Sequence, residues 1–486
     1  MPDFVFRSAV DTVAALRRRD VGSRELLDHY LDRVERLNPR VNAVVTLDAE
    51  RARARADGAD RALARGESLG LLHGLPMTVK DTFEVAGVRT TSGAELYTDH
   101  VPTADAPAVA RLVAAGAVVF GKTNTPALAG DCQTYNTIFG TTNNPWDPTR
   151  AAGGSSGGSA AALAAGLTAL ELGSDIGGSI RNPSHYCGVY GHKPSFGLVP
   201  TRGHIPPAPG TVAETDINVV GPLARDAADL ALALDVLAGP DADRGIAWRL
   251  ALPPPRRSAL REYRVAAWLD DPFCAVDGAV RERLEGAVDA LRRAGARVDD
   301  EARPGFTLAD AYRDYYTLLC AAMSTTFAEQ QFGTLMPFAD NLTADDQSMM
   351  ARFARGTALR HREWLRLHDG RERYRAAWAG FFRDHDVLVC PITPVAAIPH
   401  DHNPDWPSRR IAVDGESRSY EDQLVWAGVF GLAYLPATVA PVGRTRDGLP
   451  VGIQIVGPYL EDRTTIEVAG RLGELVGGFE IPPGYA

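Results

Sequence analysis

Apolar and polar positions alternate along the chain in a way that predicts helices and strands in turn. Apolar residues recur at helical spacing through residues 8–37, with Ser8 and Ser23 at the N-cap positions of two helices and Asn38-Pro39 at the end of the second. The further predicted helices are 49–65, 105–115, 225–238, 279–294, most of 307–385 and 461–476. The predicted strands are 41–47, 74–81, 117–120, 264–269, 296–299, 386–391, 437–442 and 451–456. A polar loop is predicted at 401–418. Strands that alternate with helices indicate an α/β fold with helices on both faces of a sheet.

Composition and charge narrow the class of protein. Length alone, at 486 residues, suggests two or three domains, and 45% hydrophobic and 23% charged residues are ordinary for a soluble globular protein. The net charge of −10 disfavours nucleic acid or an anionic membrane as a partner. The N-terminus lacks a basic start followed by an apolar core, and no apolar run reaches the roughly 20 residues of a membrane span. We therefore expect neither a signal peptide nor a membrane segment.

Cysteine and histidine usage gives no sign of a metal or a disulfide framework. Five cysteines are scattered without metal-ligand spacing, which favours a reduced, cytoplasmic setting. His400 and His402 form the one close histidine pair, in a Pro-rich loop, so we predict no metal and no cofactor. Cys187 follows Ser179 closely and is expected to be a small buried thiol rather than a second nucleophile.

Lysine is rare in this sequence. The 51 basic residues include three lysines, Lys80, Lys122 and Lys193. Arginine cannot give up its proton in a protein, whereas a buried lysine can. A lysine retained in such a chain indicates a group that must deprotonate, but for Lys122 and Lys193 chance and packing explain it equally well.

Two glycine-serine clusters, residues 153–159 and 177–179, bracket an Ala/Leu-rich segment. Glycine permits unusual backbone conformations and close approach to the main chain. Glycines directly before a serine can expose its hydroxyl and turn several N–H groups toward one point, as an oxyanion hole requires. One such cluster alone is typical of a turn. Two of them around one helix–strand unit favour a site.

Three patterns of nucleophile or phosphate sites can be compared with these clusters. Gly153-x-Ser155-x-Gly157 fits the nucleophile elbow of α/β-hydrolases, which needs a histidine downstream and leaves Lys80 without a role. Candidate histidines for that esterase-type triad are His361, His368, His385 and His400. The Ser-x-x-Lys pattern fails because no serine stands three residues before a lysine. A phosphate loop fails because no Gly-Lys-Ser/Thr follows either cluster.

An arrangement that uses both clusters resembles the amidase signature family. The similar segments are GGSSGGSAAALAAG followed by LGSDIGGSIRNP, GLPMTVKDT, GKTNTPALA, NNPWDP, GHKPS and GLPVGIQIVGP. The resemblance covers about residues 5–475, is most specific over 74–205 and is weaker over 241–385. It implies one amidase domain, 1–486, around a large twisted mixed sheet flanked by helices on both faces, with a variable helical substrate region at about 301–385. This replaces the two or three domains suggested by length.

The resemblance also implies the site residues. It makes Lys80 the base, Ser155 the bridging serine and Ser179 the nucleophile. It also makes the backbone N–H groups of Ile176, Gly177, Gly178 and Ser179 the oxyanion hole, and Ala129 and Ser155 substrate-binding. Apart from the resemblance, we expect Asp175 to be structural and to hold the glycine loop, and Arg181 either to do the same or to contact substrate. Lysine has a reference pKa of about 10.4, so Lys80 must be buried to be neutral at pH 7. Neutral Lys80 would then draw a proton from Ser155, which draws one from Ser179.

The expected function is hydrolysis of a small-molecule carboxylic amide, with esters and carbamates (urethanes) as side substrates. Two alternatives stay open: the glutamine-hydrolysing subunit of a tRNA-dependent amidotransferase, and a scaffold that keeps the fold without activity. A homodimer is also left open. Substrate is expected to meet residues 301–385 and 401–435, where aromatic residues predict hydrophobic groups or core packing equally well: Tyr312, Tyr315, Tyr316, Phe327 and Trp426.

Overall fold

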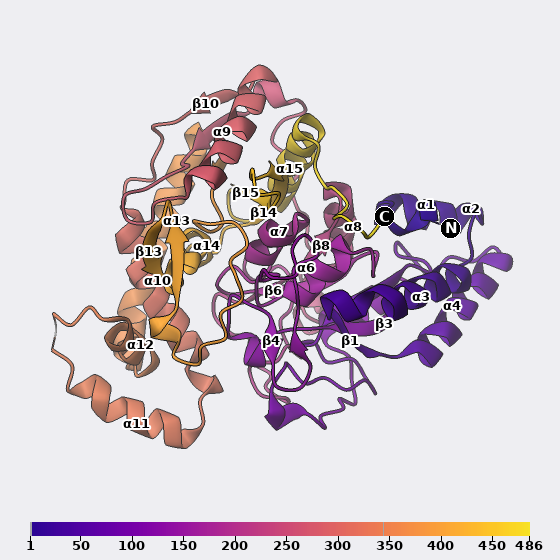
Figure 1. The fold of residues 1–486 in the computed structure, drawn as a ribbon, viewed down its shortest axis with the longest axis horizontal. Coiled ribbons are helices and arrows are strands. Elements are labelled where there is room, and N and C mark those ends of the chain that lie inside the picture. The colour runs from indigo at the N-terminus through magenta and orange to yellow at the C-terminus, as the bar shows by residue number, and fades with distance from the viewer. Residues whose placement is uncertain (1, 344) are drawn as a thin grey trace.

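A large mixed sheet forms the centre of the protein, as seen in the computed structural model, which describes residues 2–343 and 345–486 (Figure 1). In spatial order its 11 strands are β1 (Val44–Leu47), β3 (Val118–Thr123), β2 (Pro76–Lys80), β6 (Glu171–Asp175), β8 (Val219–Ala224), β7 (Tyr190–Lys193), β14 (Ala437–Arg444), β15 (Pro450–Val456), β11 (Val387–Cys390), β9 (Arg264–Ala267) and β10 (Arg297–Asp299). β2 runs parallel to both β3 and β6. From β6 onward the pairs β6–β8, β8–β7, β7–β14 and β14–β15 are antiparallel. Two short hairpins, β4 (Tyr135–Asn136) with β5 (Gly140–Thr141) and β12 (Arg410–Val413) with β13 (Glu416–Ser419), lie outside this sheet.

Helices cover both faces of the sheet, which confirms the predicted fold class. They are α1 (Pro2–Val5), α2 (Ala9–Arg18), α3 (Ser23–Val41), α4 (Ala49–Ala64), α5 (Pro107–Ala114), α6 (Gly157–Ala164), α7 (Arg181–Cys187), α8 (Ala227–Leu237), α9 (Gly278–Arg293), α10 (Leu308–Met323), α11 (Glu329–Asp340), α12 (Met349–Thr357), α13 (His361–Asp384), α14 (Val425–Leu432) and α15 (Asp462–Val476). α6 and α7 pack on the central strands from one side, and α8, α9 and α15 pack from the other. α10 and α12 to α14 form a separate group of helices beside the sheet, with α11 at its outer end (Figure 1). No helix within the described ranges is long and apolar enough to span a bilayer.

The start of the chain departs from the prediction at one cap and one helix end. Ser8 is the N-cap of α2 as expected, because its side chain accepts the N–H of Asp11. Ser23, by contrast, is the first residue of α3 and its hydroxyl donates to the Gly74 carbonyl at 2.7 Å. Pro39 does not end this helix, which continues to Val41. A proline in the last turn removes one hydrogen bond, whereas in mid-helix it would also force a kink.

The predicted polar loop 401–418 is also wrong in part, because β12 and β13 form a hairpin there. Asp414 and Gly415 form its turn with φ of 49° and 84°, the positive values that a two-residue Asp-Gly hairpin turn requires. β8 was not predicted either. It contains Gly221-Pro222, a pair depleted in strand interiors.

Candidate active site

The two glycine-serine clusters fold into adjacent loops before α6 and α7. The N–H of Ser156 donates to the carbonyl of Ser179 at 3.1 Å, so the two loops are joined through their backbones. A Cβ on Gly154 would lie 2.4 Å from the Asp131 carbonyl oxygen, which leaves room for no residue but glycine. The glycine before Ser155 is therefore needed for close packing, as its place in the sequence suggested.

Lys80 lies at the end of β2, directly beneath the first serine loop. Its side chain is fully buried, and its Nζ lies 2.6 Å from Ser155 Oγ and 3.0 Å from Ser174 Oγ. Ser174 is close because β6 runs parallel to β2 as its neighbour. Burial lowers the pKa of Lys80 to about 7, although the negative charge of Asp175 opposes the shift. A large share of the amine is thus neutral at pH 7, and the predicted burial of Lys80 is confirmed.

The second serine loop is fixed by a buried ion pair. Asp175 receives two hydrogen bonds from the Arg181 guanidinium, at 2.8 Å and 3.0 Å, and one from the N–H of Ile180 at 3.1 Å. Burial opposes ionisation of Asp175, but the charge and hydrogen bonds of Arg181 outweigh it and lower the pKa to about 2. Tyr315 holds the same loop from α10, because its hydroxyl donates to the Ile176 carbonyl at 2.9 Å. This agrees with the structural role expected for Asp175.

One of the four N–H groups predicted for the oxyanion hole is already occupied. The Gly178 N–H donates to Asp175 Oδ1 at 2.9 Å, so the prediction that it faces substrate needs correction. Among the described residues, the N–H groups of Ile176, Gly177 and Ser179 have no acceptor within the protein. These three residues also line the pocket next to the loop. They are the donors that remain for a developing oxyanion.

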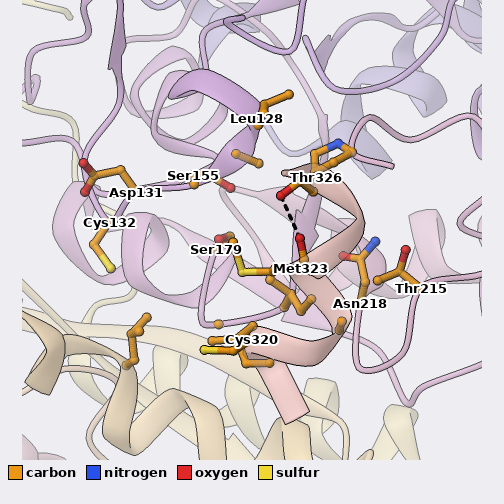
Figure 2. Close-up of a pocket in the computed structure, with 18 of the residues that line it drawn as sticks. Leu128, Asp131, Cys132, Ser155, Ser179, Thr215, Asn218, Cys320, Met323 and Thr326 are labelled. Carbon is orange, nitrogen blue, oxygen red and sulfur yellow. Dashed lines mark hydrogen bonds between the residues drawn. The ribbon is translucent and has the colours of Figure 1, made fainter. Parts of the chain in front are cut away.

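A mostly apolar pocket of about 330 Å³ opens in front of Ser155 and Ser179. Figure 2 shows both serines at this pocket, with Cys320 and Met323 of α10 facing them. Its wall is formed by Leu128, Ala129, Gly130, Asp131, Cys132, Gly154, Ser155, Ser174, Ile176, Gly177, Ser179, His204, Pro206, Pro207, Thr215, Asn218, Tyr316, Leu319, Cys320, Ala322, Met323, Thr325, Thr326, Met349, Met350, Phe353, Trp406, Pro407 and Leu424. Ala129 is therefore at the pocket, where the resemblance placed it. Both segments expected to meet substrate, 301–385 and 401–435, contribute to the wall.

The pocket contains little net charge. Of these lining residues, all within the described ranges, Asp131 is the one with an acidic or strongly basic side chain. The Asp131 carboxylate accepts hydrogen bonds from the Arg409 guanidinium at 2.6 Å and from the Tyr420 hydroxyl at 2.7 Å. The Asp131 charge is therefore paired within the protein.

Lys122 and Lys193 lie outside the pocket. Lys122 is buried against Asp81 at 3.3 Å and donates to the Phe83 carbonyl at 2.7 Å, which is a structural role. Lys193 donates to the Pro194 carbonyl at 3.0 Å, and burial lowers its pKa to about 7. Burial raises the pKa of the Cys187 thiol, so this residue is a packed thiol and not a second nucleophile.

The histidines proposed for a nucleophile elbow do not reach the serines. His361 and His368 lie on α13, His385 follows it, and His400 lies against Pro148; none of the four is among the described residues that line the pocket. The histidine that does line it is His204, whose Nε2 is 2.8 Å from Ser174 Oγ. His204 was not among the site residues predicted from the sequence. The available signal was its place within 74–205, where the resemblance is most specific.

The amidase signature fold and these motifs define the class of protein: the chain belongs to the Amidase family, whose model matches residues 25–466. It is 34% identical over 462 residues to an indoleacetamide hydrolase of Bradyrhizobium diazoefficiens, covering 94% of this chain and 84% of that one. It is 32% identical over 474 residues to a glutamyl-tRNA(Gln) amidotransferase subunit of Thermosynechococcus vestitus, covering 93% and 95% of the two chains. Among solved structures, one described as an amidase superposes with a TM-score of 0.79 at 29% identity, over 97% of this chain and 100% of the other. The protein is accordingly an amide-processing enzyme.

Proposed function

We propose that this chain hydrolyses uncharged amides that carry an apolar acyl or aryl group, with Ser179 as nucleophile, Ser155 as bridging serine and Lys80 as base. The observation that carries the proposal is the fully buried Lys80 Nζ, 2.6 Å from Ser155 Oγ at the end of an apolar pocket. Ala129 contributes to the wall that receives substrate. The sheet, which runs from residue 44 to residue 456, supports a single catalytic unit.

The proton path follows from the order of these groups. Lys80 takes the proton of Ser155, and Ser155 takes that of Ser179 as the Ser179 oxygen bonds to the substrate carbonyl carbon. The N–H groups of Ile176, Gly177 and Ser179 bind the resulting oxyanion, each contributing up to about 3–4 kcal/mol. The C–N bond then breaks, and the proton held on Lys80 returns through Ser155 to the leaving amine. Water attacks the acyl-enzyme by the same route and regenerates the Ser179 hydroxyl.

An apolar pocket favours apolar acyl groups over glutamine. A buried methylene contributes about 0.8 kcal/mol, so the four methylenes added by extending an acetyl to a hexanoyl anilide should raise kcat/KM about 200-fold. Glutamine would place an ammonium and a carboxylate against a wall whose one carboxylate, Asp131, is already paired. We expect the purified chain to hydrolyse hexanoyl and phenylacetyl p-nitroanilides, and the corresponding esters and carbamates, but not glutamine at a comparable rate.

The test compares release of p-nitroaniline and of ammonia by the purified chain alone. A Met323→Arg variant is the matched control, because a cation in the wall should raise KM for the hexanoyl anilide without changing the serine loops. If glutamine were the better substrate, or if activity required an added partner protein, the amidotransferase interpretation would replace this one.

The pH dependence of kcat/KM should follow the titration of the base, Lys80. Because neutral Lys80 is the active form and burial lowers its pKa to about 7, kcat/KM should rise about tenfold per pH unit below 7 and level off above about 8. Lys193→Met is the matched control, since burial also lowers the pKa of that residue to about 7 but it lies outside the pocket. The control should keep the same profile. A rate that instead falls as pH rises through 7 would contradict a neutral amine as base.

A further inference from the structure

A second hydrogen-bonded arm, besides that to Ser155, reaches Lys80 through Ser174. Ser174 Oγ lies 3.0 Å from Lys80 Nζ and 2.8 Å from His204 Nε2. The other ring nitrogen of His204, Nδ1, lies 2.8 Å from the carbonyl oxygen of Pro206. Both side chains are buried and both border the pocket. The arm therefore runs in the order Lys80, Ser174, His204 and Pro206.

The carbonyl at the end of this arm fixes the direction of every hydrogen bond in it. A carbonyl oxygen can only accept, so neutral His204 must hold its proton on Nδ1 and present Nε2 as an acceptor. The Ser174 hydroxyl then donates to Nε2. Its oxygen is left to accept an N–H from Lys80.

The His204 ring is held in place by its neighbours and stays uncharged. His204 stacks edge-on against Phe83 with 5.2 Å between ring centroids, and its backbone N–H donates to the Thr201 carbonyl at 3.2 Å. Burial, reinforced by the nearby Lys80, lowers the pKa of His204 to about 3. The ring therefore stays neutral over the pH range in which Lys80 titrates, and the direction of the arm does not reverse.

We propose that His204 is a positioning residue. By accepting a hydrogen bond from the Ser174 hydroxyl, its Nε2 makes the Ser174 oxygen an acceptor for Lys80, and so turns the lone pair of the neutral amine toward Ser155. A neutral amine has two N–H groups and one lone pair, and the lone pair is productive only when it faces the proton that it must take. Without His204, the Ser174 hydroxyl is free to donate to that lone pair and to compete with Ser155. The inference rests on the proposed function, since it concerns the base of that reaction.

Removing the acceptor should lower turnover without weakening substrate binding. In His204→Leu, kcat for the hexanoyl anilide should fall about 10- to 100-fold with KM nearly unchanged. This loss is part of the rate enhancement of about 10²- to 10⁴-fold that a positioned general base contributes. His204→Gln, whose side-chain oxygen can reach the place of Nε2, should keep most of the activity. His204→Asn, which is too short to reach Ser174, should not. The two amide variants also serve if the leucine variant does not fold.

The decisive measurement is the double variant His204→Leu/Ser174→Ala. Because the alanine removes the competing hydroxyl, the double variant should recover part of the kcat lost in His204→Leu. A merely structural histidine would make the double variant no better than either single one, and a direct substrate contact would raise KM; either result would overturn the proposal. Failure of the proposed function is separate, because hydrolysis would then survive Lys80→Met.

Discussion

Replacing Lys80 by methionine should abolish amide hydrolysis and leave the fold intact. The relay would lose the group that takes the proton from Ser155, and a serine hydroxyl without a base is a poor nucleophile. We expect kcat/KM to fall at least about 10³-fold, as for other residues that act as a unit in acyl transfer. Methionine fills a similar volume and removes an amine whose charged form is penalised by burial, so the melting temperature should be unchanged or higher.

The control for this experiment is Lys193→Met, a second fully buried lysine with one hydrogen bond to a backbone carbonyl. Both variants should be compared by initial rates with the hexanoyl anilide, and by mass spectrometry after a fluorophosphonate that labels the nucleophile. The label should appear on Ser179 in the wild type and in Lys193→Met, and much more slowly in Lys80→Met. Hydrolysis rates near the wild-type value in Lys80→Met would contradict a Ser-Ser-Lys relay.

The sequence was most informative where glycine is required by packing. Gly154 approaches the backbone at Asp131, and the second cluster forms the loop held by Asp175, so both clusters lie at one pocket. The strands β2 and β14 were predictable because they are short apolar runs bounded by turn residues. The motifs of the resemblance then placed Lys80 beside Ser155.

What the sequence could not reveal are contacts made between segments far apart in the chain. Ser174 is only a small residue in a buried strand, and its contact with Lys80 exists because β2 and β6 pair in parallel. His204 reaches Ser174 through a bridge between its own segment and Phe83. Periodicity reports which face of an element is buried but not which element lies opposite, so neither residue could be assigned. The occupied N–H of Gly178 escaped prediction for a different reason: its acceptor, Asp175, is only three residues away, and the motif does not show that this side chain turns back onto its own loop.

Replacing Asp175 by alanine should be the most destabilising single change near the site. Asp175 and Arg181 are both fully buried, and removal of one partner of such a pair leaves an uncompensated charge, which costs about 3–5 kcal/mol. The N–H groups of Gly178 and Ile180 also lose their acceptor. Since the pKa of Asp175 is lowered to about 2, its contribution to stability is present above about pH 4 and is lost as pH falls toward 2. Urea unfolding at pH 7 and pH 3 measures both effects.

Stability and catalysis can be separated with two further variants. Asp386→Ala removes another buried carboxylate, paired with Arg257 and Arg264 away from the pocket, so it should lower the free energy of unfolding but leave kcat unchanged. Asp175→Ala/Arg181→Met removes both charges and should recover much of the stability lost in Asp175→Ala. Its kcat should stay low, because the loop that carries Ile176, Gly177 and Ser179 still lacks the carboxylate that orients it. Recovery of both quantities together would mean that Asp175 supports only the fold, and that the oxyanion donors keep their geometry without it.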